Sequence, residues 1–354
     1  MPAFRFDNVL GIARNLKAYL GIEGGVTRGP APVERQREIS GHFEAMRQRI
    51  RGQESALRKK DSEISRLKED LRSAHVSAKD SPRKGPKDRP PIPGDEVQSA
   101  GGALPDFVVI GAQKCGTTTF YQTLIKNPYV GRSAKKEVHF FDHNFDKGLG
   151  WYRAHFPAPE LKDGQRTITG EASPYYLAHS LAPERASKVI PQAKLIALLR
   201  NPVDRAYSHY QHAVRFGRDP LSFEDAIEAE EDRMRKSRDK ILAEQGFTPA
   251  IPSGRSYLAR GVYVDQLLEW NRFFDRDQLL VLKAEDYFTD LPGTMKTVLD
   301  FLGLPDWEPE EPPKVKNQGG YQERMKPETR EKLQAYFEPH NRRLYEYLGR
   351  DFGW

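Results

Sequence analysis

The chain of 354 residues contains 56 lysines and arginines and 50 aspartates and glutamates, a formal net charge of +6. That excess lies entirely in residues 1–103, so residues 104–354 are neutral overall and lack the dense basic stripe of a nucleic-acid-binding domain. A single cysteine, Cys115, excludes an internal disulfide, and no apolar run of about 18 residues predicts a transmembrane helix. The N-terminus has no signal-peptide layout, and together these features favour a reduced, cytoplasmic protein.

Two segments before residue 104 have distinct compositions. Residues 1–32 include a basic amphipathic helix over 4–22 that ends in a glycine-rich stretch. Such a helix either lies on a membrane surface or packs against a partner, and the pattern leaves both interpretations open. Residues 77–103 alternate prolines with charged and small residues, which cannot bury enough apolar surface to fold. They predict a semi-extended linker.

Between these segments, residues 33–76 repeat apolar residues with a period of seven. The a positions of this pattern are Phe43, Ile50, Leu57, Ile64 and Leu71. An unbroken apolar column over five heptads predicts a coiled-coil stalk that joins copies of the chain into a homo-oligomer, either a dimer or a trimer. Gln53 and Lys60 occupy d positions, where a polar residue can fix register or strand number.

From residue 104 onward, short apolar runs alternate with amphipathic segments. The predicted strands cover 106–110, 167–171, 194–200 and 278–283. The predicted helices cover 117–126, 148–155, 180–190, 203–217, 222–235, 255–274, 292–303 and 327–348. This alternation predicts an α/β fold with a P-loop-type, mainly parallel sheet flanked by helices, in one domain over 104–354. Ligands of such sheets bind beyond the carboxyl ends of the strands.

The first predicted strand ends in a glycine-containing loop followed by a helix. Gly111 and Gly116 have the spacing of a nucleotide-binding P-loop, whose backbone N–H groups and helix dipole converge on one anion. The lysine lies inside the loop, at Lys114, whereas a Walker-type kinase needs it after the second glycine. This position favours a cradle for a single phosphate and transfer of a different group. The candidate anion-binding residues are Lys114, Cys115, Gly116, Thr117, Thr118 and Thr119.

A second candidate phosphate site follows the strand predicted over 194–200. Arg200 ends that apolar run, and Ser208 lies eight residues further along, after a proline-capped helix start. A guanidinium fork and a hydroxyl are a suitable pair for a terminal phosphate. Because both candidate sites follow strands of one parallel sheet, we expect them on the same edge of that sheet.

In these motifs and their order, the chain resembles the sulfotransferases that use 3′-phosphoadenosine 5′-phosphosulfate (PAPS), in particular the heparan sulfate branch and its bacterial relatives. The matching segments are 111–119, 136–142, 198–208 and 347–354. The resemblance implies that Lys114 contacts the 5′-phosphosulfate, while Arg200 and Ser208 clamp the 3′-phosphate. It also implies that the segment ending in Tyr321 starts a loop that closes over PAPS.

Residues 136–142 match the family segment that carries the catalytic base, which implies that Glu137 is the general base. A glutamate enclosed next to anionic PAPS would have a raised pKa, which suits a base working near neutrality. His139 would face the same side in an extended segment, and it either assists or replaces Glu137. Asp142 matches a family position near the acceptor. Apart from the resemblance, a surface glutamate paired with a lysine and a structural histidine explain the pattern equally well.

The resemblance implies an enzyme that moves a sulfuryl group from PAPS to a hydroxyl or an amine of a saccharide or small-molecule acceptor, without a metal. Ala172 departs from the lysine often found there in the animal heparan enzymes, and the Lys-Gly-Arg sequence expected after Tyr321 is absent. Two alternatives stay open, a P-loop kinase using ATP and a non-catalytic coiled-coil scaffold. The missing Gly-Lys-Ser/Thr sequence disfavours the kinase, and the presence of Lys114, Glu137 and Arg200 disfavours the scaffold.

Overall fold

The computed structural model describes residues 102–245, 251, 254–310 and 324–354. All of them lie in the second of two compact units into which the chain divides, residues 89–354. The expected amphipathic helix and coiled-coil stalk, almost all of the expected linker, and Tyr321 lie outside the described residues. None of the helices within the described ranges is both long enough and apolar enough to cross a bilayer.

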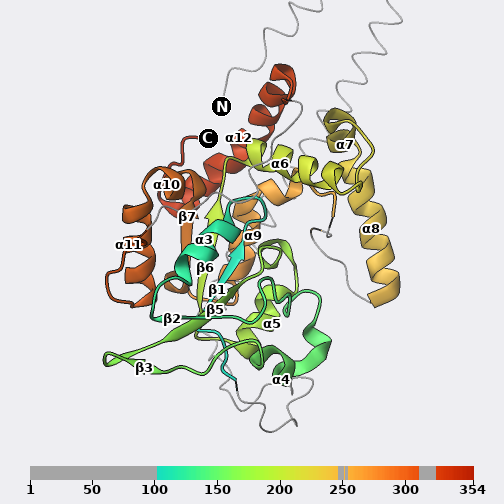
Figure 1. Cartoon of the computed structure of the whole chain (residues 1–354). Helices are drawn as coiled ribbons and strands as arrows, with labels where there is room; N and C mark the ends of the chain where they lie inside the picture. The colour runs from blue at the N-terminus through green and yellow to red at the C-terminus, as the bar shows by residue number, and fades with distance from the viewer. Residues whose placement is uncertain (1–101, 246–250, 252–253, 311–323) are drawn as a thin grey trace, which may run out of the picture. The chain divides into compact units, whose positions relative to one another are not determined.

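A five-stranded sheet forms the centre of this unit, and each neighbouring pair of strands is parallel (Figure 1). Its spatial order is β2 (Val130–Arg132), β5 (Ile168–Ala172), β1 (Phe107–Gly111), β6 (Lys194–Leu199) and β7 (Leu279–Lys283). Every residue of β1 is buried, because both faces of the sheet are covered. The sheet and its flanking helices confirm the expected α/β fold.

Ten α-helices lie within the described residues, and most of them connect the strands (Figure 1). They are α3 (Thr117–Leu124), α4 (Gly148–Arg153), α5 (Ala182–Val189), α6 (Pro202–Arg215), α7 (Phe223–Glu228), α8 (Glu230–Gln245), α9 (Tyr263–Asn271), α10 (Ala284–Thr289), α11 (Leu291–Leu302) and α12 (Pro327–Leu348). Short 3-10 turns are η2 (Phe145–Lys147), η3 (Tyr176–Ala178), η4 (Ala259–Gly261) and η5 (Arg276–Gln278).

The differences from the expected elements are local. The helix predicted over 222–235 is two helices, α7 and α8, and the helix predicted over 255–274 begins only at Tyr263. Gly261 precedes it at a close approach, where a Cβ would lie 2.7 Å from Phe337. A hairpin of β3 (Leu161–Lys162) and β4 (Gln165–Arg166) was not expected. Its two-residue turn has φ of 51° at Asp163 and 77° at Gly164, as in a type I′ turn.

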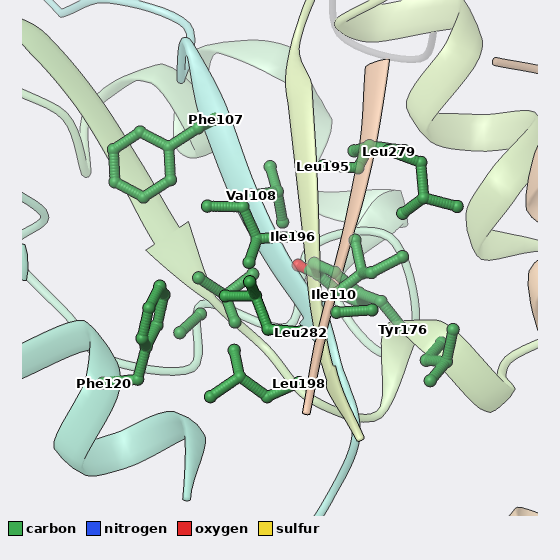
Figure 2. Close-up of a cluster of buried hydrophobic side chains, with 14 of the residues drawn as sticks. Phe107, Val108, Ile110, Phe120, Tyr176, Leu195, Ile196, Leu198, Leu279 and Leu282 are labelled. Carbon is green, nitrogen blue, oxygen red and sulfur yellow. The ribbon is translucent and has the colours of Figure 1, made fainter. Parts of the chain in front are cut away.

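The buried side chains of the sheet form the main hydrophobic core (Figure 2). Phe107 and Ile110 from β1 and Leu198 from β6 are completely buried, as is Phe120 from α3. Each such side chain contributes about 1.5–3 kcal/mol relative to its exposed state. This core holds the carboxyl ends of β1 and β6 rigidly beside each other, and the loops at those ends inherit that fixed spacing.

A second core cluster holds α6 in place. Val203, Ala206 and Tyr207 on one face of α6 pack with Phe223 from α7 and Phe337 from α12. Helical residues four and seven positions apart share a face, so Ser208, His212 and Arg215 lie together on another face of α6. The packing therefore fixes the direction in which α6 leaves the sheet.

Candidate active site

The loop after β1 folds tightly around its two glycines. A Cβ at Gly111 would lie 2.5 Å from Leu177, and a Cβ at Gly116 would lie 2.9 Å from Phe288. Gly116 has φ of 85°, and Lys114 has φ of 72°, which is uncommon for a residue with a side chain. Left-handed residues alternating with right-handed ones turn successive N–H groups toward one concave space, an arrangement that binds anions.

Helix α3 begins directly after this loop. Its N-cap is Gly116, and no side chain in the described part of the chain caps it, so the N–H groups of its first turn remain for a ligand. Thr117 and Thr119 are buried, and Thr118 is half-buried. The loop and the helix start together have the geometry expected of a phosphate cradle.

Cys115 connects this loop to the second phosphate motif. Its buried Sγ lies 3.8 Å from the hydroxyl of Tyr263, and that hydroxyl donates to the carbonyl oxygen of Arg200 at 2.8 Å. Burial raises the pKa of the Cys115 thiol to about 11. The thiol is therefore neutral and packs in the core, and the N–H of Cys115 donates to the carbonyl oxygen of Ala112 at 3.2 Å, which closes the loop.

The second motif occupies the end of β6 and the start of α6. Asn201 caps α6, since its Oδ1 accepts from the backbone N–H groups of Val203 at 3.0 Å and Asp204 at 3.4 Å. Its own N–H donates to Glu285 Oε1 at 2.9 Å, which fixes the turn after Arg200. Ser208 follows on α6 and is buried.

Lys114 lies within a group of positive charges. Burial lowers its pKa, and repulsion from Arg215, Arg200 and Arg205 lowers it further. Arg205 is fully buried, and its Nε and Nη1 have no hydrogen-bond partner among the described residues. A cluster of cations with unused donors is unfavourable by itself and suits a polyanionic ligand. Lys114 and Arg200 follow the neighbouring strands β1 and β6, and the charge of Arg200 acts on Lys114, so both lie at the same edge of the sheet. Their binding of the two ends of one nucleotide stays a prediction.

The predicted catalytic residues form a short chain of contacts. Glu137 Oε2 lies 3.4 Å from His139 Nε2, and His139 Nδ1 lies 2.7 Å from Asp142 Oδ2. Glu137 Oε1 also contacts Lys136 Nζ at 2.5 Å. The Asp142 side chain is completely buried, whereas that of Glu137 is 41% exposed, so the chain of contacts runs from the core to an accessible carboxylate.

These contacts reverse one expectation. Burial acts to raise the pKa of Glu137, but hydrogen bonds from His139 and Lys136 outweigh it and lower that pKa to about 2. For His139, burial acts to lower the pKa, but hydrogen bonds to Asp142 and Glu137 raise it to about 9. Without bound ligand, Glu137 is a carboxylate and His139 an imidazolium, whereas the sequence predicts a raised pKa for Glu137.

The backbone explains why Glu137 and His139 face each other. Their φ angles are 59° and 56°, so the segment is not extended as the sequence interpretation assumes. Non-glycine residues in this region persist only where the surroundings hold them. Here Ser173 Oγ accepts from the N–H of His139 at 3.1 Å, and the Tyr176 hydroxyl accepts from the N–H of Phe140 at 2.6 Å.

Glu171, on β5, anchors this arrangement from inside the core. Its fully buried carboxylate accepts from the hydroxyls of Ser173 at 2.6 Å, Tyr152 at 2.8 Å and Tyr176 at 3.0 Å. It also accepts from the N–H of Val138 at 3.3 Å. Burial raises the pKa of Glu171. This network joins the catalytic segment to the sheet, and it is not evident from the sequence because Tyr152 and Val138 lie 19 and 33 residues from Glu171.

Arg260 joins the catalytic segment to the phosphate loop. Its buried guanidinium donates to Gln113 Oε1 in the loop and lies 4.5 Å from the ring centroid of Tyr175. The Tyr175 ring in turn stacks on His143 at 5.5 Å. The two parts of the site are thus held by one continuous set of contacts.

Two further residues of α6 belong to the site, and the sequence analysis did not single them out. The pKa of His212 is lowered by burial first and then by the charges of Lys114 and Arg215, and Glu137 acts in the opposite direction. His212 and Arg215 lie four and seven residues after Ser208, so all three share one face of α6. That spacing was the signal available in the sequence.

The comparisons with known proteins agree with this geometry. A family model described as Sulfotransferase domain matches residues 104–318. Heparan sulfate glucosamine 3-O-sulfotransferase 6 of Homo sapiens is 31% identical over 290 residues, covering 75% of this chain and 79% of that protein. Bifunctional heparan sulfate N-deacetylase/N-sulfotransferase 1 of Mus musculus is 34% identical over 211 residues, covering 57% of this chain and 22% of that protein.

A solved structure is also similar. The crystal structure of a sulfotransferase from Alicyclobacillus acidocaldarius has a TM-score of 0.54 and 30% sequence identity, and the match covers 71% of this chain and 98% of that one. The chain belongs to the sulfotransferase domain family. It is a PAPS-dependent sulfotransferase, which confirms the function expected from the sequence and decides against the kinase and the non-catalytic scaffold.

Proposed function

We propose that the site transfers a sulfuryl group from PAPS to an acidic saccharide, with Glu137 as the general base. The observation that supports this proposal is that Lys114 and Arg200 follow the paired strands β1 and β6 at one edge of the sheet. The charges of Lys114 and Glu137 both act on the pKa of His212, which supports a place for Glu137 near the same site. The cation cluster and its unused donors fit a nucleotide with two separate anionic ends. PAPS supplies the sulfuryl group, and its 5′-phosphate is the leaving group.

Each residue has a distinct role in this proposal. Lys114 and the N–H groups of the loop hold the phosphate end and stabilise the charge that develops on it. Arg200 and Ser208 hold the 3′-phosphate. Glu137 accepts the proton of the acceptor hydroxyl or amine, because it is ionised while His139 carries a proton already. His139, held by Asp142, orients Glu137 and is a positioning residue.

Calorimetry with desulfated cofactor tests the donor site. We expect 3′-phosphoadenosine 5′-phosphate to bind at least tenfold more tightly than ADP, without a magnesium requirement, because Arg200 and Ser208 recognise the additional phosphate. Arg200→Gln should remove most of this preference, and Lys114→Met should weaken both ligands. Equal affinity for the two nucleotides in the unmodified protein would contradict the assignment of the second motif.

The end of α6 supports an acidic saccharide as acceptor. Phe216, directly after α6, is 54% exposed, and the guanidinium groups of Arg215 and Arg218 lie 5.2 and 5.4 Å from its ring centroid. Neither arginine forms an ion pair within the described ranges. An aromatic face suits the C–H surface of a sugar ring, and guanidinium groups suit its carboxylate or sulfate groups. The ring centroids of His212 and Phe216 are 4.8 Å apart, so His212 links this surface to the site.

Charge removal at this surface should affect the acceptor most. We expect the double variant Arg215→Gln/Arg218→Gln to raise KM for an acidic oligosaccharide acceptor about tenfold or more, and to change KM for PAPS by a smaller factor, because Arg215 also adds positive charge near Lys114. Arg342→Gln, at an exposed arginine on α12, is the matched control and should leave both constants unchanged. An unchanged acceptor KM in the double variant, measured with acidic and neutral saccharides in parallel, would argue for a neutral acceptor.

We also propose that residues 33–76 form a coiled-coil stalk that makes the protein a homo-oligomer. Its support is the unbroken apolar a column in the sequence. Ile50→Asp/Leu57→Asp places charges in that column and should convert the full-length protein to a monomer by light scattering, with kcat unchanged. If the unmodified chain is itself monomeric at micromolar concentration, the stalk proposal is wrong.

A further inference from the structure

Three potential metal ligands converge beside the proposed base. His139, Asp142 and His143 each offer one ligand atom, and these three atoms lie within 4.8 Å of one another. Asp142 Oδ2 lies 2.7 Å from His139 Nδ1 and 4.0 Å from His143 Nε2. Ligand atoms around a zinc ion, with bonds of about 2.0–2.2 Å, are roughly 3–4 Å apart, so small side-chain rotations bring all three to one centre.

The three ligands are held by the surrounding backbone. The Asp142 side chain is completely buried, and its Oδ1 accepts from the N–H of His143 at 2.6 Å. Asn144 Nδ2 donates at 3.0 Å to the carbonyl oxygens of Val138 and His139. His143, by contrast, is 52% exposed, which gives an ion access from solvent. A metal therefore needs little ordering of the chain before it binds.

Glu137 supplies the partner that a metal-bound histidine usually has. A histidine that binds a metal through one ring nitrogen commonly donates its other N–H to a carboxylate. Here Nδ1 of His139 faces Asp142 and the candidate centre, and Nε2 faces Glu137 Oε2 at 3.4 Å. Glu137 is therefore placed as the outer partner of a metal-bound His139.

We propose that His139, Asp142 and His143 bind one divalent transition metal ion, with Zn²⁺ as the probe, and that this binding inhibits sulfuryl transfer. The ring nitrogens donate their lone pairs to the metal, and any protons on those nitrogens are released to water. The bound ion fixes the ring of His139, and through the 3.4 Å contact with Nε2 of that ring it holds the Glu137 carboxylate in place. Glu137 then cannot turn toward the acceptor hydroxyl or amine. Two imidazoles favour Zn²⁺ over Mg²⁺, which prefers oxygen ligands.

The inhibition rests on the proposed role of Glu137, but metal binding does not, so the two are measured separately. Calorimetry with Zn²⁺ and visible absorption with Co²⁺ are recorded on the full-length protein without PAPS. We expect one metal ion to bind per chain. His143→Phe should lower the affinity for the metal tenfold or more, because it keeps a ring against Tyr175 but removes the ligand nitrogen. Asp142→Asn should weaken metal binding as well, and a melting curve for each variant checks that it is folded.

Turnover assays give the second readout. Zn²⁺ should abolish activity in the unmodified enzyme, and His143→Phe should require at least tenfold more Zn²⁺ for half-inhibition, with each protein compared with its own activity in the absence of metal. The same concentrations of Mg²⁺ should have no effect. Equal inhibition of the two proteins, or equal Zn²⁺ affinity, would overturn the site. Metal binding that depends on His143 without inhibition would retain the site and refute the inhibition.

Discussion

Glu137→Gln is expected to lower kcat by about 10²–10⁴-fold, the usual contribution of a positioned general base. The amide keeps the shape of the side chain but cannot accept the acceptor proton. Because Glu137 is half-exposed and outside the core, the variant should unfold at nearly the same temperature as the unmodified protein. Single-turnover assays with saturating PAPS isolate the chemical step from release of the product nucleotide.

The affinity for 3′-phosphoadenosine 5′-phosphate is the control for Glu137→Gln. It should not fall, since Lys114, Arg200 and Ser208 are untouched. Full activity in the variant would contradict the role of Glu137. His139 would then be the next candidate for the base. Its role is tested by comparing the rates of His139→Asn and the unmodified protein above pH 9, where His139 in the unmodified protein loses its proton.

Glu171→Gln is the second change with a large expected effect, although Glu171 lies too deep to touch a substrate. Its four neighbours all donate hydrogen bonds to it, so the amide NH₂ of the variant meets a donor in either orientation. If the NH₂ faces away from the N–H of Val138, it meets the hydroxyl of Tyr176, which already accepts from the N–H groups of Phe140 and Phe141. One buried donor left without an acceptor costs about 1–3 kcal/mol of stability. The catalytic segment should also shift, and a displacement of about 1 Å can reduce the rate about 10²-fold.

The kinetic constants separate this positioning effect from general damage. Glu171→Gln should lower kcat while KM for PAPS stays nearly constant, because the network holds residues 137–140 and not the phosphate loop. Glu184→Gln, at a half-exposed glutamate on α5 paired with Lys188, is the matched control and should change neither stability nor rate. A variant that melts normally and turns over at the full rate would refute the anchoring role.

The parts of this structure that the sequence predicts well are those governed by local patterns. Apolar runs located four strands of the sheet, and the glycine spacing located the loop at 111–116. The strand β2 was missed because three residues, Val130–Arg132, give too short a pattern, and α10 was missed because it directly follows β7. The close packing of Gly261 against Phe337, rather than helix propensity, explains why α9 begins only after Gly261.

The site shows the same division. The rule for parallel sheets predicts that Lys114 and Arg200 lie at the same edge of the sheet, whereas the pairing of β1 with β6, which makes them neighbours, comes from the structure. The sequence does not predict the lowered pKa of Glu137, because that pKa depends on where His139 and Lys136 place their hydrogen-bond donors. Those placements come from left-handed backbone at two residues, held by Ser173 and the network around Glu171. No local pattern encodes contacts between segments more than thirty residues apart in the chain.

One consequence follows from the single helix α6. Ser208 in the middle of α6 and Arg215 at its C-terminal end are seven residues apart, so about 10 Å of helix axis separates the proposed phosphate contact from the proposed saccharide contact. The helix α6 therefore fixes the distance between the proposed donor contact and the proposed acceptor contact. Inserting one residue between them would turn Arg215 by about 100° and uncouple the two specificities, whereas exchanging side chains beyond the last turn would retune the acceptor alone.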